Sequence, residues 1–190
     1  MQYLSLGCAV VLAGVFLASG VSKLSNRPAR RAFVESIRLL LGSVVRRPGL
    51  VAVVAVAAEL GAVVLLGLPV SRSLGFGLAV AILLAYTCVL AISVQRGVEQ
   101  PCRCFGTTSN RRIGREDLWR NGFLIFVGVL GYVSLHYSVS SALYPYWAAI
   151  AVGGGVLVAG LLVTIDDLLW LMGVAGGSGR VHNPSPTSQP

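Results

Sequence analysis

Long apolar stretches alternate with short polar segments along most of the chain. The apolar stretches cover residues 3–22, 49–70, 74–94, 121–139 and 146–165. Each is close to the roughly twenty residues that a helix needs to cross a bilayer core, because a helix rises only about 1.5 Å per residue. The pattern therefore predicts an all-α integral membrane protein, built as a bundle of four to five transmembrane helices.

Residues 26–47 are too charged to span a membrane but keep a helical pattern. Asn26 followed by Pro28 indicates a helix start, and Gly42 indicates its end. Between them the apolar residues recur at helical spacing; they are Phe33, Ile37, Leu40, Leu41 and Val44. We predict an amphipathic interfacial helix that lies in the headgroup layer between spans one and two. Packing of its apolar face on the bundle is a compatible alternative.

The transmembrane domain is expected to take in residues 1–172. A tight turn at residues 71–73 should join spans two and three into an antiparallel hairpin, and Glu116 and Asp117 should open the first turn of span four. Asp166 and Asp167 mark the exit of span five, with residues 168–172 along the interface. Residues 173–190 are rich in Gly, Ser and Pro without an apolar period, so we predict a disordered tail.

Charge refines this picture. Only 12% of the residues are charged, about half of what a soluble domain carries. The net charge of +8 comes from basic residues in loops beside apolar spans, which indicates the lipid bilayer rather than a nucleic acid as partner. With the N-terminus outside, residues 23–48, 95–120 and the tail are cytoplasmic, and they hold every Lys and Arg except Arg72. The bias predicts a multi-pass protein of the cell membrane with this orientation.

The candidate chemistry lies in Gln100-Pro101-Cys102-Arg103-Cys104-Phe105-Gly106, within the loop before span four. The two thiols are one residue apart, roughly 6–7 Å in an extended chain, so a disulfide between them would be strained and easily reduced. Arg103 favours the reactive thiolate of either neighbour. Because cytosolic thiols are kept reduced, a cytoplasmic pair would be a transient redox centre.

Two other interpretations of Cys102 and Cys104 stay open. They are a pair of loop cysteines without a role, or half of a metal site. The metal site is the weaker one, because the imidazoles, His136 and His182, are distant in sequence. We predict no metal.

Glu59 lies midway along span two, where a charge costs on the order of 3 kcal/mol. We expect its carboxyl group to be protonated or paired inside the bundle, either with a functional or partner-binding role or as a structural hydrogen-bonding group. Glu59→Gln is then expected to keep fold and insertion. Cys88 in span three is expected to pack as a small residue, and His136 to be an interfacial hydrogen-bonding residue. Small residues in spans one and five, among them Gly14 and residues 153–155, predict close helix packing.

The sequence resembles the MauE family of methylamine-utilisation membrane proteins, within the wider DoxX-like group. The resemblance covers about residues 5–140. It is carried by residues 13–24, by Ala58-Glu59-Leu60, by Cys102-Arg103-Cys104-Phe105-Gly106, and by Arg120-Asn121 at the start of span four. It implies a multi-pass bundle linked to maturation of the disulfide-rich small subunit of methylamine dehydrogenase, together with a thioredoxin-like partner. The residues it points to are Cys102 and Cys104, and after them Glu59 and Lys23.

The expected function is membrane-embedded support of thiol–disulfide maturation of an extracytoplasmic client protein. Cys102 and Cys104 would exchange, Glu59 would be proton-linked or a packing group, and Lys23, Arg103 and Cys88 would be accessory residues. The alternative is a non-catalytic membrane scaffold or transporter-like module whose cysteines serve partner binding. The sequence identifies no cofactor, and it leaves open quinone use, the electron donor, the client and whether the protein is itself an enzyme.

Overall fold

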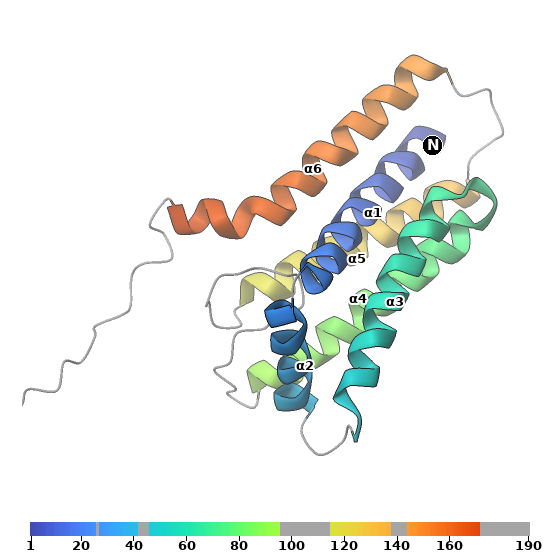
Figure 1. Cartoon of the computed structure of the whole chain (residues 1–190). Helices are drawn as coiled ribbons and strands as arrows, with labels where there is room; N and C mark the ends of the chain where they lie inside the picture. Colours follow the sequence, from blue (N-terminus) through green and yellow to red (C-terminus); the bar gives the residue numbers. More distant parts are fainter. Residues whose placement is uncertain (26, 42–45, 96–114, 138–143, 172–190) are drawn as a thin grey trace, which may run out of the picture.

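The structure is a computed structural model that describes residues 1–25, 27–41, 46–95, 115–137 and 144–171. The regular elements in these ranges are α1 (Gln2–Leu24), α2 (Arg27–Leu41), α3 (Pro48–Gly67), the short 3₁₀ helix η2 (Pro69–Ser71), α4 (Arg72–Gln95), α5 (Arg115–His136) and α6 (Pro145–Leu171) (Figure 1). Among the described residues, five helices are long and apolar enough to cross a membrane, namely α1, α3, α4 with η2, α5 and α6. The predicted all-α membrane bundle is confirmed.

The helix ends depart from prediction at the hairpin between α3 and α4. We placed the turn at residues 71–73, whereas α3 ends at Gly67 and α4 already begins at Arg72. Side chains explain the shift. Ser71 Oγ donates to the Leu65 carbonyl and Arg72 Nε to the Leu66 carbonyl, each at 3.2 Å. These bonds satisfy carbonyls of the last turn of α3, which have no partner within their own helix.

The other ends differ less. Helix α1 continues to Leu24, so that Lys23 belongs to the span itself. Helix α5 begins at Arg115, as expected from Glu116 and Asp117. Helix α6 runs unbroken to Leu171, past the exit predicted at Asp166 and Asp167. The predicted tail, residues 173–190, lies outside the described residues.

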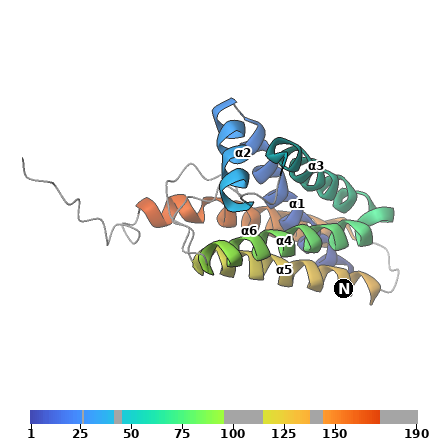
Figure 2. The same cartoon turned by 90° about the horizontal axis from the view of Figure 1, so that it is seen from below.

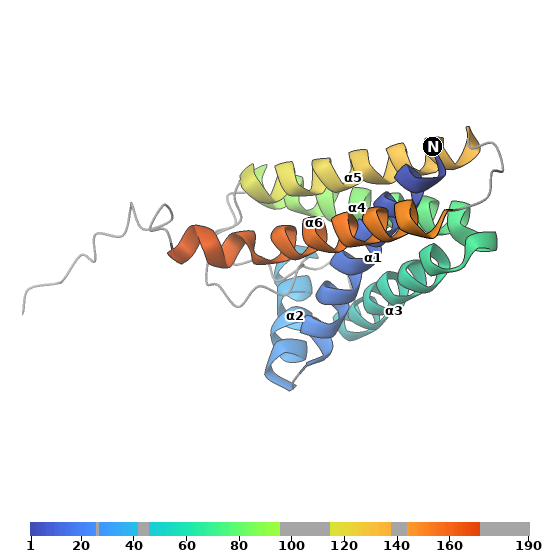
Figure 3. The ribbon, with the colours of Figure 1, turned by 90° about the horizontal axis from the view of Figure 1, so that it is seen from above.

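Helix α1 is the central helix of the bundle. It packs on α3, α5 and α6, and seen from opposite sides it lies between α3 and α5 (Figures 2 and 3). Half of its spanning segment is buried, against about a tenth of that of α6. The core gathers around it from every spanning helix; its largest members are Leu12 and Phe16 of α1, Leu66 of α3, Phe76 and Leu83 of α4 and Leu124 of α5.

Helix α2 packs on the bundle through its apolar face. Phe33 and Ile37 are buried against Ala52 of α3, whereas Arg27, Arg30 and Arg31 are exposed. In Figure 1 this helix lies beside the end at which α3 begins and α4 finishes. Packing on the bundle, the alternative named above, is therefore confirmed. An arginine-bearing outer face is compatible with the headgroup layer.

Several glycines permit close helix contacts, and those of Gly75 and Gly155 reach the backbone of a neighbouring helix. A Cβ on Gly75 of α4 would lie 2.7 Å from the backbone nitrogen of Leu66, so that α3 and α4 touch backbone to backbone. A Cβ on Gly155 of α6 would lie 2.9 Å from Val10 of α1 and 3.0 Å from the Gly7 carbonyl. Of the three consecutive glycines in α6, Gly155 makes the close contact, and the other two have open space around them.

Candidate functional site: a buried lysine–glutamate cluster

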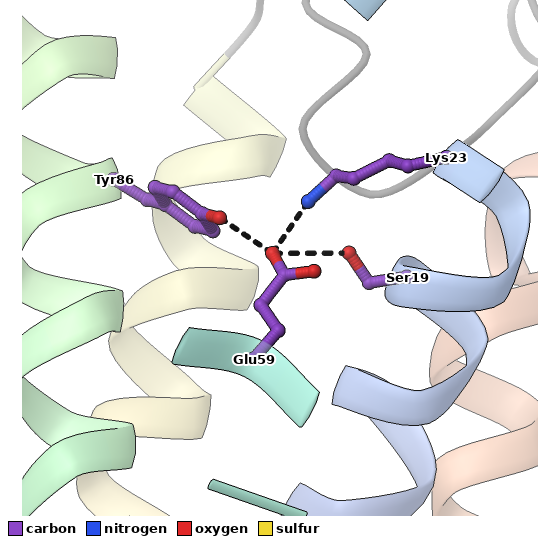
Figure 4. Close-up of polar contacts among 4 residues, drawn as sticks. All are labelled: Ser19, Lys23, Glu59 and Tyr86. Carbon is purple, nitrogen blue, oxygen red and sulfur yellow. Dashed lines mark hydrogen bonds and ion pairs between the residues drawn. The ribbon is translucent and has the colours of Figure 1, made fainter. Parts of the chain in front are cut away.

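The carboxylate of Glu59 in α3 gathers donors from two other helices (Figure 4). Its Oε1 is paired with Nζ of Lys23 in α1. It also accepts a hydrogen bond from the hydroxyl of Tyr86 in α4 at 2.5 Å, and a longer one from Ser19 in α1 at 3.5 Å. Ser19 and Lys23 are four residues apart, which places both on one face of α1. The cluster therefore joins α1, α3 and α4 inside the bundle.

Both charges of the pair are withdrawn from solvent. The exposed fraction of the side chain is 2% for Lys23 and 0% for Glu59. Neither charge could be buried alone without a large desolvation penalty, and each is tolerated because the other neutralises it. Three donors converge on one oxygen, which is the pattern expected around an ionised carboxylate.

Lys23 is held by aromatic rings as well. Its Nζ lies 4.7 Å from the ring centroid of Phe33 in α2 and 5.2 Å from that of Tyr86. Both distances fall within the range of cation–π attraction. Through Phe33 the cluster reaches a fourth helix, so one lysine links α1, α2, α3 and α4.

The second oxygen of Glu59 differs from the first. Oε2 accepts no hydrogen bond from any residue in the described part of the chain, although it is buried. It points toward Gly20, where an added Cβ would lie 3.9 Å away. A buried acceptor without a partner is uncommon and calls for an explanation. This oxygen is free to accept a hydrogen bond from a small donor.

The structure brings together two of the predicted site residues, Lys23 and Glu59. Glu59 was expected to be protonated or paired, and it is paired. Tyr86 and Ser19 were missed. The sequence did contain a signal for these two residues, since a tyrosine and a serine inside apolar spans are hydroxyl groups that need hydrogen-bond partners when buried.

Of the other predicted site residues, Cys88 is described by the structure, and it is not part of the cluster. Cys102, Arg103 and Cys104 lie outside the described residues, so their roles remain predictions. Cys88 was expected to pack as a small residue; its side chain is exposed in the described part of the chain, so its packing role stays a prediction. His136 is exposed as well, with its ring edge-to-face on Tyr132 at 4.6 Å between centroids.

No three His, Cys, Asp or Glu side chains gather into a metal site within the ranges that the structure describes. That finding leaves Cys102 and Cys104 untested, and the prediction of no metal stays a prediction.

The segment with the two cysteines is flanked by α4 and α5. It connects Gln95, the last residue of α4, to Arg115, the first of α5. In Figure 1, α4 finishes and α5 begins at the end of the bundle where α1 finishes and α3 begins. Tyr86 precedes Gln95 by nine residues, about 14 Å along a helix. The cluster thus ties α4, one of the two helices that carry this segment, to α1 and α3.

Spanning helices packed around a buried Lys–Glu pair define a small multi-pass helical membrane protein. Within that class, residues 1–134 match the model of the family described as Methylamine utilisation protein MauE. The chain belongs to this family, as its resemblance predicted. The match takes in α1 to α4 and nearly all of α5, and α6 lies beyond it. A search of curated proteins and a search of solved structures found no match.

Proposed function

We propose that the protein supports thiol–disulfide maturation of an extracytoplasmic client, with Cys102 and Cys104 as the exchanging pair. The observation that carries this proposal is the position of Cys102-Arg103-Cys104-Phe105-Gly106 inside the region that matches the MauE family. The family description supports methylamine utilisation as the context. The small subunit of methylamine dehydrogenase is then the type of client to be tested first.

The chemistry is ordinary thiol–disulfide exchange. A client thiolate attacks one sulfur of the Cys102–Cys104 disulfide and releases the other as a thiolate, which leaves a mixed disulfide. A second client thiolate then attacks the mixed disulfide, so that the client is oxidised and the pair is left as a dithiol. A thioredoxin-like partner in its disulfide form would reoxidise the pair. A strained Cys-x-Cys bond suits this direction, because strain makes a disulfide more oxidising.

The buried cluster would support this chemistry from inside the bundle. The Lys23–Glu59 pair joins α1 to α3, the hydrogen bond from Tyr86 adds α4, and Phe33 adds α2. It would therefore hold the end of α4 from which the cysteine segment departs. The proton-linked role of Glu59 rests on Oε2, which accepts no hydrogen bond from the described residues.

Replacement of Cys102 or Cys104 by serine tests the proposal. Each variant should insert and fold as the wild type does, because the substituted residue serves exchange rather than packing, while client maturation fails. Each single variant should also trap a mixed disulfide with its partner, since the resolving thiol is gone. Non-reducing gels of acid-quenched membranes would show the trapped species.

Cys88→Ser is the matched control and should behave as the wild type. Normal client maturation by the double Cys→Ser variant would overturn the proposal.

A second candidate function is a membrane scaffold whose cysteines bind a partner without cycling. The observation that favours it is that the polar cluster in the described part of the chain is an ion pair that ties helices together. The thiol state of Cys102 and Cys104 after acid quench separates the two functions. A cycling pair is found partly as disulfide and shifts when the client is co-expressed, whereas a binding pair keeps one state.

A further inference from the structure

A groove on the outer surface of the bundle opens beside the buried cluster. It has a volume of about 290 Å³ and lies between the end of α1, α2 and the first half of α3. Its lining includes Lys23, Arg30, Phe33, Val53, Val56 and Leu60. We refer to it below as the α2–α3 groove. Apart from Lys23 and Arg30, the described residues that line it are apolar or glycine.

The two cations of the groove are in different states. Lys23 is neutralised by Glu59 inside the bundle. Arg30 is exposed on α2 and forms no ion pair within the described part of the chain. The groove therefore offers one free positive charge, beside an otherwise apolar channel.

The length of the groove matches one leaflet of a bilayer. Its lining follows α3 from Gly49, near the helix start, to Leu60. From Gly49 to Leu60 the helix rises by about 16 Å, and one leaflet of the hydrocarbon core is about 15 Å thick. The volume is at the lower end of ligand pockets, roughly 300–1,000 Å³, which suits one extended chain.

We propose that the α2–α3 groove binds an anionic phospholipid, with one acyl chain along α3 and the headgroup phosphate on Arg30. The positive charge of Arg30 favours an anionic headgroup. The length of the groove along α3 favours an acyl chain that starts at the interface and ends near the bilayer centre. With the topology predicted from loop charge, this leaflet is the cytoplasmic one, which carries anionic lipids. The bound chain would pack against Phe33, the ring that contacts Lys23.

A second groove on the other side of α3 serves as an internal control. It has about 270 Å³ and is lined by residues of α2, α3 and α4, including Phe33, Val54 and Tyr86. The described residues around it include no charged side chain. It matches the first groove in size and in apolar lining but lacks the arginine.

Native mass spectrometry of the full-length protein tests the site. The protein in detergent micelles is titrated with phosphatidylglycerol, or with phosphatidylcholine of the same acyl chains, and the apparent affinity of the first bound lipid is measured. The wild type should prefer phosphatidylglycerol. Arg30→Gln should weaken phosphatidylglycerol binding about fivefold, the effect of one basic residue near an anionic surface. Arg31→Gln, an exposed arginine of the same helix outside the groove, should leave it unchanged. Glycerol 3-phosphate, which has no chain, should not compete at the same concentration.

Blocking the groove supplies the second arm. Val53→Trp fills the α2–α3 groove and should abolish the preference, whereas Val54→Trp fills the uncharged groove and should preserve it. Both valines are largely exposed on α3, at 69% and 59%, so both variants should fold; Ala57→Trp is a second blocking variant. Equal affinity for the two lipids, or an equal loss with Arg31→Gln, overturns the proposal. A Val53→Trp protein that keeps its lipid preference also overturns the proposal. So does a Val53→Trp protein in which only the oligomeric state changes, because that result would indicate a partner helix in the groove.

Discussion

At the scale of single residues, Lys23 and Glu59 should stabilise the bundle only as a pair. Lys23→Met or Glu59→Gln leaves one buried charge without its counterion, which destabilises proteins by about 3–5 kcal/mol. The double variant Lys23→Met/Glu59→Gln removes both charges and should lose much less. Unfolding of the four proteins in detergent gives a double-mutant cycle that isolates the coupling. Glu35→Gln, an exposed carboxylate of α2, is the control and should be near neutral.

This pairing changes an expectation drawn from the sequence. Glu59→Gln was expected to be tolerated, since Gln keeps the shape and hydrogen bonding of a protonated carboxyl group. In the structure Lys23 is buried against that carboxylate, and only 2% of its side chain is exposed. Gln at position 59 should therefore leave the Lys23 charge buried without a counterion. A Glu59→Gln protein as stable as the wild type would show that the carboxyl group is neutral in the folded bundle.

At the scale of elements, the α3–α4 hairpin should depend on Gly75. A Cβ there would lie 2.7 Å from the Leu66 nitrogen and 2.9 Å from the Leu65 carbonyl carbon. Backbone atoms cannot rotate away, so Gly75→Ala should separate the two helices and lower the thermal midpoint. Gly77 on the same helix has nothing within 4 Å of an added Cβ. Gly77→Ala should therefore be neutral or gain up to about 1 kcal/mol of helix propensity. Equal midpoints for the two variants would contradict the close contact.

At the scale of the whole molecule, the charge distribution predicts which end of the bundle is cytoplasmic. Cys102 and Cys104 should resist a membrane-impermeant maleimide in intact cells and react after permeabilisation. Val70, which is 98% exposed in η2, just past the far end of α3, provides the control. Val70→Cys in a background with Cys102 and Cys104 replaced by serine should label in intact cells. The reverse pattern would invert the orientation and put the cysteine pair on the side of the proposed client.

The sidedness bears directly on the proposed function. If the cysteine pair is cytoplasmic and the client extracytoplasmic, electrons must cross the bilayer or a partner must carry them. If the pair is extracytoplasmic, exchange with the client is direct. The labelling experiment therefore decides which additional component the proposed chemistry needs.

The sequence alone indicated the positions of the apolar spans, the amphipathic α2 and the family. The spans could be predicted because the thickness of the hydrocarbon core fixes how long an apolar helix must be. The amphipathic α2 could be predicted because a helix with one solvent-exposed face carries its apolar residues along the opposite face, as Phe33 and Ile37 do. Glu59 was conspicuous because a carboxylate in an apolar span carries a large desolvation cost.

Only the tertiary structure decided what Glu59 meets. Lys23 and Tyr86 are 36 and 27 residues away from it in the chain, and the rotation of three helices brings them together. Spans such as α3 are apolar all round, so periodicity does not reveal which face turns inward. For the same reason the sequence does not show which glycines make close contacts. Gly75 and Gly77 are two residues apart on one helix, but Gly75 touches a neighbouring backbone and Gly77 faces open space. The hydrophobic effect in a bilayer determines whether a helix crosses the membrane. Specific side-chain packing determines how that helix is rotated against its neighbours.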